Sequence, residues 1–550
     1  MEGKVLKTRN CVAYGLGDLY GGGAFLLIST FTMYYLVAVI GLNPILAGLI
    51  PGLGKIWDAV SDPLMGYISD RTRSKLGKRR VWFLIGIIPI FVSMVLIWLP
   101  VKFSTDFGLF IYYFLAYIFF YTVSTMVLVP YGALSAEMAE QFKDRNKLTG
   151  FRMFFSMLAA LLCGTVPEMI INRFQDPKTG HLVMGIIFGV FFMLPWIFVY
   201  FGTWDKQEDP GSQKKTNFVT NFASIFKNKS FRIHIAMYIF AYATMDVLMG
   251  WIKFYLADYL HKPGFLTIGM GSILITQIAC LPLYIAIANK KGHATAFRIG
   301  LLIMAIGLAA MYLHGPSTPT IVLIINCIII GMGQSAAVLV PFQLLPFVAD
   351  VDELMTGEKR AGTYAGAMTL IRKLIQGAAV LPLLGLILSI IGYLGPLPKS
   401  FTIEDFENNI KPQVALKAPQ YESAVSDAYT KDDSLYKLNE KADTAVLRQT
   451  RIAFDTIKYK GTGASLKTFA TPQTDSTQES IHLLFSLIPI LFLTAGILAS
   501  LKFKLNPETH KVLRNEMDRL NAGGNKEQAP PEVKEICKVL SGMDYEKIRI

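Results

Sequence analysis

Apolar runs long enough to cross a bilayer recur along almost the whole chain, and they limit what it can fold into. A helix needs roughly 20 mostly apolar residues to span the hydrocarbon core. In lipid a single helix satisfies its own backbone hydrogen bonds. The sequence therefore predicts an all-α polytopic membrane protein with twelve transmembrane helices. We place them near residues 12–40, 44–69, 81–100, 107–138, 150–172, 182–203, 233–260, 265–288, 296–314, 319–349, 362–395 and 481–503.

A polar, basic stretch separates the first six runs from the other six. Duplicated six-helix halves are common in secondary transporters. The predicted parts are an N-terminal six-helix bundle (1–203), a cytoplasmic central loop (204–231), helices seven to eleven of a C-terminal bundle (232–395), an extracytoplasmic insertion (396–480), helix twelve (481–503) and a cytoplasmic tail (504–550).

The net charge of +13 comes from Lys and Arg in short loops between apolar runs. These loops all fall on one face if the N-terminus is inside, which is the positive-inside pattern. We therefore expect a multi-pass protein of the cell's cytoplasmic (inner) membrane with both termini in the cytoplasm, and no nucleic-acid partner. Walker, Ser–His–Asp and metal-ligand patterns are absent from the sequence. We expect a protein that is not an enzyme, has no cofactor and works from an ion gradient.

The predicted insertion is polar and too long for a plain connector. Helix-like spacing of apolar residues appears around Ala445 to Ile457. The insertion is either a small cap or a mobile loop, and the sequence leaves both open. In the tail, Asn506 followed by Pro507 is typical of a helix start, and we expect this helix to run to about Leu520.

Two carboxylates, Asp58 and Asp62, stand four residues apart in the second run, so they share one helix face. Such a pair can ligate a desolvated Na⁺ or hold a proton between its members. The alternative is that the acids form buried ion pairs with Lys55 or with arginines. Because acids inside a membrane are costly, a functional site is the default hypothesis. Pro63 frees a backbone carbonyl that could act as a further ligand.

Six basic residues fall between Arg71 and Arg80, directly after Asp70. They are either simple topology signals or part of a gate that closes the inner face. The predicted gating residues, which share that face, are Asp70, Arg71, Arg79, Asp350, Lys359 and Arg360.

Four further charges lie inside apolar runs of the second half. Lys373 needs a carboxylate partner there, whereas its neighbour Arg372 points about 100° away and can reach the interface by snorkelling. Asp246 lies in the middle of the seventh run and can add to a substrate site, whereas Lys253 is nearer the end of the run and can snorkel.

Several motifs together resemble the glycoside–pentoside–hexuronide:cation symporters of the major facilitator superfamily, the melibiose-permease type. The matching residues are Trp57-Asp58-Ala59, Asp62-Pro63, Gly66, Asp70-Arg71-Thr72, Gly77-Lys78-Arg79, Tyr14 to Asp18, Val129 to Leu134, Arg152, Ala349-Asp350-Val351, Lys359 to Gly362, Lys373 and Leu505 to Glu508. The resemblance implies the major facilitator fold and alternating access of two halves. It also implies that Asp58 and Asp62 hold the coupling cation, H⁺ or Na⁺, near Thr369 and Lys373, and that Arg152 lines the central cavity.

The chain departs from that family pattern at three positions. Leu128 stands where the melibiose-permease type has a further acid of the cation site, which leaves H⁺ open beside Na⁺. Gly22 stands at the position of a sugar-binding aspartate, for which Asp18 can substitute. Gly132 stands at the position of an aromatic sugar platform. The aromatic residues that could replace it are Tyr121, Tyr131, Tyr364 and Phe342.

We therefore expect a monomeric symporter that couples cation entry to uptake of a glycoside, pentoside or hexuronide. The predicted substrate residues are Asp18, Arg152, Lys373, Tyr121, Tyr131, Asp246 and Tyr364. Two alternatives remain. One is a symporter of lysolipids or other amphiphiles, because that relative shares the Trp-Asp-Ala and Asp-Pro pattern. The other is a membrane sensor that transports nothing and binds its ligand through 396–480.

Overall fold

The computed structural model describes residues 6–138, 142–205, 224–357, 360–432, 435–457 and 468–548, and its long elements are helices. In chain order the spans are α1 (Thr8–Leu16), α2 (Asp18–Tyr34) and η1 (Tyr35–Ile40); α3 (Pro44–Arg71); α4 (Arg80–Trp98); α5 (Asp106–Met138); α6 (Phe142–Ile171); α7 (Pro177–Met193) and α8 (Pro195–Gly202); α10 (Lys229–Phe254) and η2 (Tyr255–Tyr259); α11 (Phe265–Lys291); α12 (His293–Met311); α13 (Thr320–Thr356); α14 (Ala361–Ile375), η3 (Gln376–Val380) and α15 (Leu381–Ile390); and α20 (Asp475–Leu501).

These segments match the twelve predicted spans in number and order. Among the described residues, eleven are long and apolar enough to cross a membrane. The twelfth is α3, which has 28 residues and the charged side chains of the predicted cation site. Several span ends differ from the predicted bounds: α6 begins at Phe142, α13 ends at Thr356, and helix twelve begins at Asp475, inside the predicted insertion. The Thr474 hydroxyl accepts a hydrogen bond from the Thr477 backbone, which starts the helix there.

The chain divides into two compact units that do not follow the order of the sequence. Unit 1 contains Met1–Glu208, Met249–Ile268 and Gln376–Leu483, and unit 2 contains Asp209–Leu248, Gly269–Ile375 and Leu484–Ile550. The C-terminal part of the seventh span therefore packs with the first six spans, and so does the C-terminal part of the eleventh. The division into six-helix bundles at the central loop stays a prediction.

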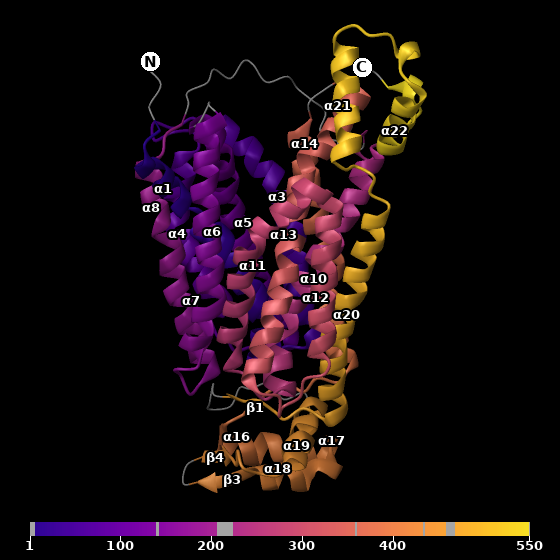
Figure 1. Cartoon of the computed structure of the whole chain (residues 1–550). Coiled ribbons are helices and arrows are strands. Elements are labelled where there is room, and N and C mark those ends of the chain that lie inside the picture. The colour runs from indigo at the N-terminus through magenta and orange to yellow at the C-terminus, as the bar shows by residue number, and fades with distance from the viewer. Residues whose placement is uncertain are drawn as a thin grey trace. The chain divides into compact units, whose positions relative to one another are not determined.

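In unit 1, the helices α4, α6, α7 and α8 run side by side, and the insertion gathers at the end of the unit opposite α1 (Figure 1). Helix α3 packs against η3 and α15 with two glycines at the contact. A Cβ at Gly377 would lie 2.5 Å from the carbonyl oxygen of Gly52, and one at Gly385 would lie 2.1 Å from that of Pro44. Small residues permit this close approach between helices in a membrane.

A buried ion pair joins the seventh span to the fifth within unit 1. Lys253 Nζ lies 2.9 Å from Glu168 Oε2, and the two side chains are only 6% and 4% exposed. The ammonium group also lies over the rings of Phe31 and Tyr34, at 4.7 and 4.8 Å from their centroids. Lys253 therefore does not snorkel to an interface, because a carboxylate partner is within reach.

The described part of the insertion is a small folded subdomain, so the small-cap alternative holds. Its elements are β1 (Leu397–Pro398), β2 (Ser400–Thr402), α16 (Ile403–Asp405), η4 (Phe406–Ile410), α17 (Lys411–Lys417), η5 (Pro419–Tyr421), α18 (Glu422–Ala428), β3 (Tyr429–Asp432), β4 (Leu435–Leu438), α19 (Thr444–Thr456) and β5 (Thr468–Phe469). The antiparallel strands have the order β2-β4-β3, with Phe401 opposite Tyr436, and β1 pairs with β5. Phe401, Phe406 and Phe454 are fully buried in its core.

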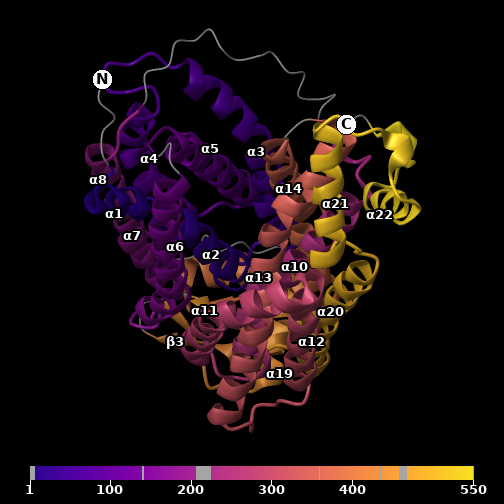
Figure 2. The ribbon, with the colours of Figure 1, turned by 45° about the horizontal axis from the view of Figure 1, so that its top comes forward.

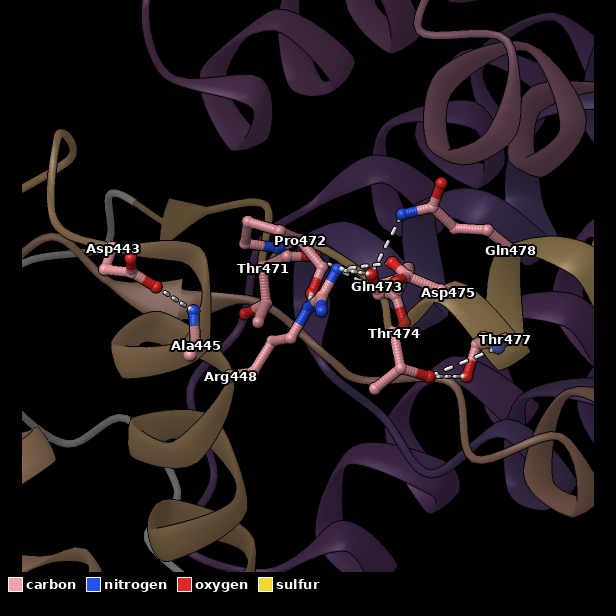
Figure 3. Close-up of polar contacts among 10 residues, drawn as sticks. All are labelled: Asp443, Ala445, Arg448, Thr471, Pro472, Gln473, Thr474, Asp475, Thr477 and Gln478. Atoms are coloured by element: carbon pink, nitrogen blue, oxygen red, sulfur yellow. Dashed lines mark hydrogen bonds and ion pairs between the residues drawn. The ribbon is translucent and has the colours of Figure 1, made fainter. Parts of the chain in front are cut away.

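Helix α19 is the predicted helix at 445–457, and it anchors the subdomain to the start of α20 (Figure 3). Asp443 caps the helix by accepting a hydrogen bond from the Ala445 backbone at 2.7 Å. Arg448 donates to the carbonyl oxygen of Pro472 at 3.1 Å and also to that of Gln473. Its ion pair with Asp475 is peripheral, because that carboxylate is 90% exposed.

In unit 2, the tail helices α21 (Pro507–Asn521) and α22 (Pro531–Ser541) pack against α13, at the end of the unit where α14 begins (Figure 2). The predicted start of α21 is confirmed, because the Asn506 side chain accepts the Thr509 N–H at 2.8 Å. Burial acts to raise the pKa of Glu516, but hydrogen bonds from Arg519 and Tyr545 outweigh it and hold that pKa below its ordinary value.

Replacing Arg448 by Met should loosen the insertion. Its two carbonyl acceptors would lose a charged donor, which costs about 1.5–3 kcal/mol. We expect faster hydrogen exchange in 444–457 and 468–474. Asp475→Asn is the matched control and should change stability by less than about 1 kcal/mol, because exposed ion pairs contribute little. Equal exchange in both variants would contradict this anchoring.

Replacing Lys253 by Met should destabilise the protein by about 3–5 kcal/mol, because it leaves the Glu168 carboxylate buried without its partner. Thermal unfolding in detergent measures the loss. The double variant Glu168→Gln/Lys253→Met should recover most of it. If the loss of stability in the double variant equals the sum of the losses in Glu168→Gln and Lys253→Met, the two residues are not coupled.

Candidate functional site

Two of the predicted cation residues, Asp58 and Asp62, form one cluster of oxygens with Thr125 and Ser61 between α3 and α5 in unit 1. Asp58 is buried, and its Oδ2 lies 3.2 Å from Lys55 Nζ. The hydroxyl of Thr125 lies 3.2 Å from Asp58 Oδ1 and 3.0 Å from Asp62 Oδ1. The Ser61 hydroxyl lies 3.0 Å from the same Thr125 oxygen. The i, i+4 spacing does therefore bring both carboxylates to one point.

This cluster has more oxygen–oxygen contacts than its hydroxyl hydrogens can fill. Thr125 has a single hydroxyl hydrogen and can donate it to one carboxylate only. Ser61 can donate its own to Thr125 or to the backbone oxygen of Asp58, which lies 3.2 Å away. A proton on a carboxylate, or a cation among the oxygens, would complete the remaining carboxylate–hydroxyl contact. This is the chemistry expected of a proton or Na⁺ site.

Lys55 is the ion-pair partner that the buried-pair alternative requires for Asp58. Its ammonium lies 4.6 Å from the ring centroid of Phe25 and 4.9 Å from that of Tyr121. Tyr121, which we predicted as a substrate residue, is therefore placed beside the carboxylate cluster. Among the described residues, no group of three or more His, Cys, Asp or Glu side chains could hold a metal ion. A Na⁺ here needs oxygens such as the Thr125 hydroxyl besides Asp58 and Asp62.

Three other predicted substrate residues come together in unit 1. Arg152 Nε on α6 donates to Asp18 Oδ1 on α2 at 3.1 Å. The guanidinium lies 5.3 Å from the ring centroid of Tyr131 on α5. Tyr131 stacks on Tyr14 and donates its hydroxyl to the Tyr14 carbonyl at 2.8 Å. The aspartate is buried, whereas 36% of the arginine side chain is exposed. The pair presents guanidinium donors on a partly open surface.

In unit 2, Asp246 on α10 pairs with Arg372 on α14. Arg372 Nη2 lies 3.8 Å from Asp246 Oδ1, and its guanidinium lies 4.0 Å from the ring centroid of Tyr242. The expectation that Arg372 snorkels was wrong, because a carboxylate and an aromatic face lie within its reach. Lys373 follows it on the same helix.

The other two predicted residues of α14, Thr369 and Tyr364, have contacts within unit 2. Thr369 is exposed and donates its hydroxyl to the Ala365 carbonyl at 3.1 Å. Tyr364 is fully buried against Phe231, and its hydroxyl accepts a hydrogen bond from Asn228 at 3.3 Å. Their parts in cation and substrate binding stay predictions.

Of the predicted gating residues of unit 1, Arg79 is held by Asp205, which follows α8. The backbone N–H groups of Arg79 and Arg80 donate to Asp205 Oδ2 at 3.0 and 3.4 Å. Gly77 adopts a φ of +105° there, and a Cβ at this position would collide with the Asp205 carboxylate. Arg71 lies over the ring of Tyr67 at 3.4 Å. The side chain of Asp70 lies outside the described residues.

The predicted gating residues of unit 2 have partners that we did not expect. Asp350 Oδ2 lies 2.7 Å from His510 Nε2 of the tail helix α21. Arg360 instead forms a two-pronged pair with Asp352, at 2.6 and 2.8 Å. Lys359 lies outside the described residues. The gating role of both sets stays a prediction.

Sequence reasoning missed residues that complete these clusters. Glu168 offered a signal, because it is an acid in an apolar run and Lys253 needed such a partner. The sequence offers no comparable signal for Thr125, Asp205 and Asp352, because threonines in spans and acids at helix ends are common. Their roles come from a second helix, which spacing along the first does not reveal.

Comparisons with known proteins agree with this architecture. A family model described as MFS/sugar transport protein matches residues 13–414. An uncharacterized symporter of Synechocystis, sll1374, is 24% identical over 474 residues, which cover 70% of this chain and 86% of the relative. A putative sulfoquinovose importer of Escherichia coli is 24% identical and covers 72% of this chain and 84% of its own length. A sodium-dependent lysophosphatidylcholine symporter of Danio rerio is 22% identical, with 60% and 68% covered.

Solved structures show the same fold. A bacterial homologue of the human lysosomal transporter Spinster aligns with a TM-score of 0.58 at 13% identity, over 92% of this chain and all of that one. A D-xylose–proton symporter aligns with a TM-score of 0.51 at 16% identity, over 70% and 97%. The predicted fold and family are confirmed. The chain belongs to the MFS/sugar transport family and is a multi-pass membrane symporter rather than an enzyme.

Proposed function

We propose that the protein couples entry of H⁺ or Na⁺ to uptake of a glycoside, pentoside or hexuronide. Its relatives include a putative glycoside/cation symporter and a putative sulfoquinovose importer, both of Escherichia coli. It works as a monomer in the cytoplasmic membrane, with both termini inside. Its two halves give alternating access, and Asp70, Arg71, Arg79, Asp350, Lys359 and Arg360 close the inner face.

The carboxylate cluster of α3 carries this proposal. Asp58 and Asp62 contact one Thr125 hydroxyl, and Lys55 pairs with Asp58. These three charged groups sum to one negative charge, which suits one monovalent cation. H⁺ would protonate Asp62 or Asp58 and complete the hydrogen bonds, whereas Na⁺ would take oxygens from both. A cation-binding role for Thr369, which belongs to unit 2, is a separate part of the proposal.

The substrate site uses the Asp18–Arg152 pair beside Tyr131. A carboxylate next to a guanidinium offers acceptors and donors along one edge, which matches the alternating hydroxyls of a sugar. Tyr121 provides an aromatic face near the cation cluster. We also propose substrate roles for three residues that belong to unit 2: Asp246, Tyr364 and Lys373.

A competing substrate is a lysolipid, because lysophosphatidylcholine symporters are among the relatives. Uptake into proteoliposomes with an imposed Na⁺ or H⁺ gradient separates the candidates. The panel contains neutral sugars, sugar acids and lysophosphatidylcholine. Accumulation of sugar alone supports the proposal, accumulation of lysolipid alone overturns its substrate class, and no uptake of any compound favours a sensor.

Asp58→Asn and Asp62→Asn should each abolish gradient-driven accumulation, because each removes a charge that holds the coupling cation. Substrate exchange without a gradient serves as a readout of folding and substrate binding. Full accumulation in both variants would refute the cation site.

Thr125→Val should raise the half-saturating cation concentration roughly 10-fold, since it removes a hydrogen bond to a charged group. Thr122→Val is the matched control on the same helix. The exposed Thr122 hydroxyl accepts a hydrogen bond from Trp57 Nε1 at 2.8 Å. We expect its cation dependence to stay normal, and a similar shift in both variants would contradict a specific role for Thr125.

A further inference from the structure

A partly open cavity of about 560 Å³ lies in unit 1, where the insertion subdomain meets the ends of the spans. Its wall is formed by α19 of the insertion, the end of α15 and the links before α3 and α5. The charged and polar residues of this wall include Asn43, Ser104, Asp106, Ser389, Arg451 and Asp455. Ligand pockets in proteins have volumes of about 300–1,000 Å³, so the cavity has room for a molecule the size of a sugar.

Arg451 stands out in this wall, because its side chain is buried while most of its donors are unused. The side chain is 11% exposed, and its Nη2 donates to Asp455 Oδ1, one turn along α19, at 2.7 Å. In the described part of the chain this is the only hydrogen bond of the guanidinium, and its Nε is buried without a partner. A guanidinium has five N–H donors, and burying a charge is costly unless it is hydrogen-bonded. The oxygens of a ligand would supply the missing acceptors.

The rest of the wall combines acceptors, hydroxyls and apolar surface. The Asp455 carboxylate is 53% exposed and can accept further hydrogen bonds. The hydroxyls of Ser104 and Ser389 can both donate and accept. Val37 and Phe454 add apolar surface. A sugar uses all of these groups, because it has hydroxyls around its rim and C–H groups on its faces. An acyl chain would use the apolar part alone.

Fastening of the subdomain does not explain the donors of Arg451, as a second arginine of the same helix shows. Arg448 fastens the subdomain through the backbone carbonyls of Pro472 and Gln473. Arg451 has no backbone acceptor among the described residues, although a Cβ at Gly395 would lie only 3.0 Å from its Nη2. Its guanidinium therefore contacts the end of the eleventh span by packing and leaves its donors to the cavity.

We propose that this cavity is an outer sugar-binding site, in which the insertion captures the substrate before transport. Arg451 donates to hydroxyl oxygens of the sugar, and Asp455 accepts from its hydroxyl groups. The site is built from other residues than the Asp18–Arg152 pair, so it is a second site on the same chain. This inference rests on the proposed function, and the predicted topology places the insertion on the side from which an imported sugar arrives.

The test counts bound sugar per chain by equilibrium dialysis of the full-length protein in detergent, with radiolabelled D-xylose, methyl β-D-glucoside and D-glucuronate as probes. Wild type should bind two molecules of the sugar that it transports. Arg451→Met should weaken one of the two roughly 10- to 100-fold, since hydrogen bonds from a charged group are lost. In proteoliposomes the same variant should raise the KM of uptake and leave the maximal rate unchanged, because capture precedes transport.

A second variant blocks the cavity without touching Arg451. Ser104 is exposed in the link before α5, so Ser104→Trp should fold normally, fill the cavity and also leave one sugar per chain. Phe103→Trp is the matched control, because Phe103 is exposed in the same link and does not line the cavity. It should bind two sugars. Hydrogen exchange in 444–457 should stay as in wild type in Arg451→Met, because its partner Asp455 is half exposed and can be solvated by water.

The outcomes separate this site from the proposed function. Uptake with one sugar per chain and the same affinity in wild type and Arg451→Met overturns the outer site and leaves sugar symport standing. Two sugars in both Arg451→Met and Ser104→Trp overturn it as well. Faster exchange in Arg451→Met, with two sugars still bound by Ser104→Trp, assigns Arg451 a structural role and overturns the site. Neither binding nor uptake of any sugar by wild type overturns the proposed function itself.

Discussion

Pairing of charges inside the spans is the constraint on which the rest of the structure depends. An unpaired charge in a bilayer costs several kcal/mol, so each one fixes a contact between helices. In unit 1, Glu168 and Lys253 join the fifth span to the seventh, and Asp18 and Arg152 join the first to the fifth. In unit 2, Asp246 and Arg372 join the seventh to the eleventh. Apolar side chains pack against lipid or protein almost equally well, whereas these pairs accept one arrangement.

Structural features that depend on a single segment of the chain were predicted correctly from the sequence. Span length and order follow from hydropathy, because a bilayer of fixed thickness demands runs of fixed length. The start of α21 followed from the side chain of Asn506 and the fixed φ of Pro507. The meeting of Asp58 and Asp62 followed from the pitch of one helix.

The partners on other helices could not be predicted in the same way. Lys373 was singled out, yet its neighbour Arg372 reaches Asp246, because which face of α14 meets α10 is decided by packing. Thr125 joins the carboxylates only because α5 lies beside α3. The insertion shows the same limit: α19 was visible in its spacing, but the sheet depends on pairing Phe401 with Tyr436 across the subdomain.

The charge of the cation cluster gives a physical reason for coupling in the proposed mechanism. In that mechanism Asp58, Asp62 and Lys55 together carry one negative charge in an apolar setting until a cation binds, and rearranging the helices around that charge is costly. One bound monovalent cation removes that charge. A site with both carboxylates and no lysine would need two monovalent cations or one divalent cation for the same effect. In the proposed mechanism Lys55 would therefore set the stoichiometry at one cation, and the cost of moving the cluster without that cation would make uncoupled transport slow.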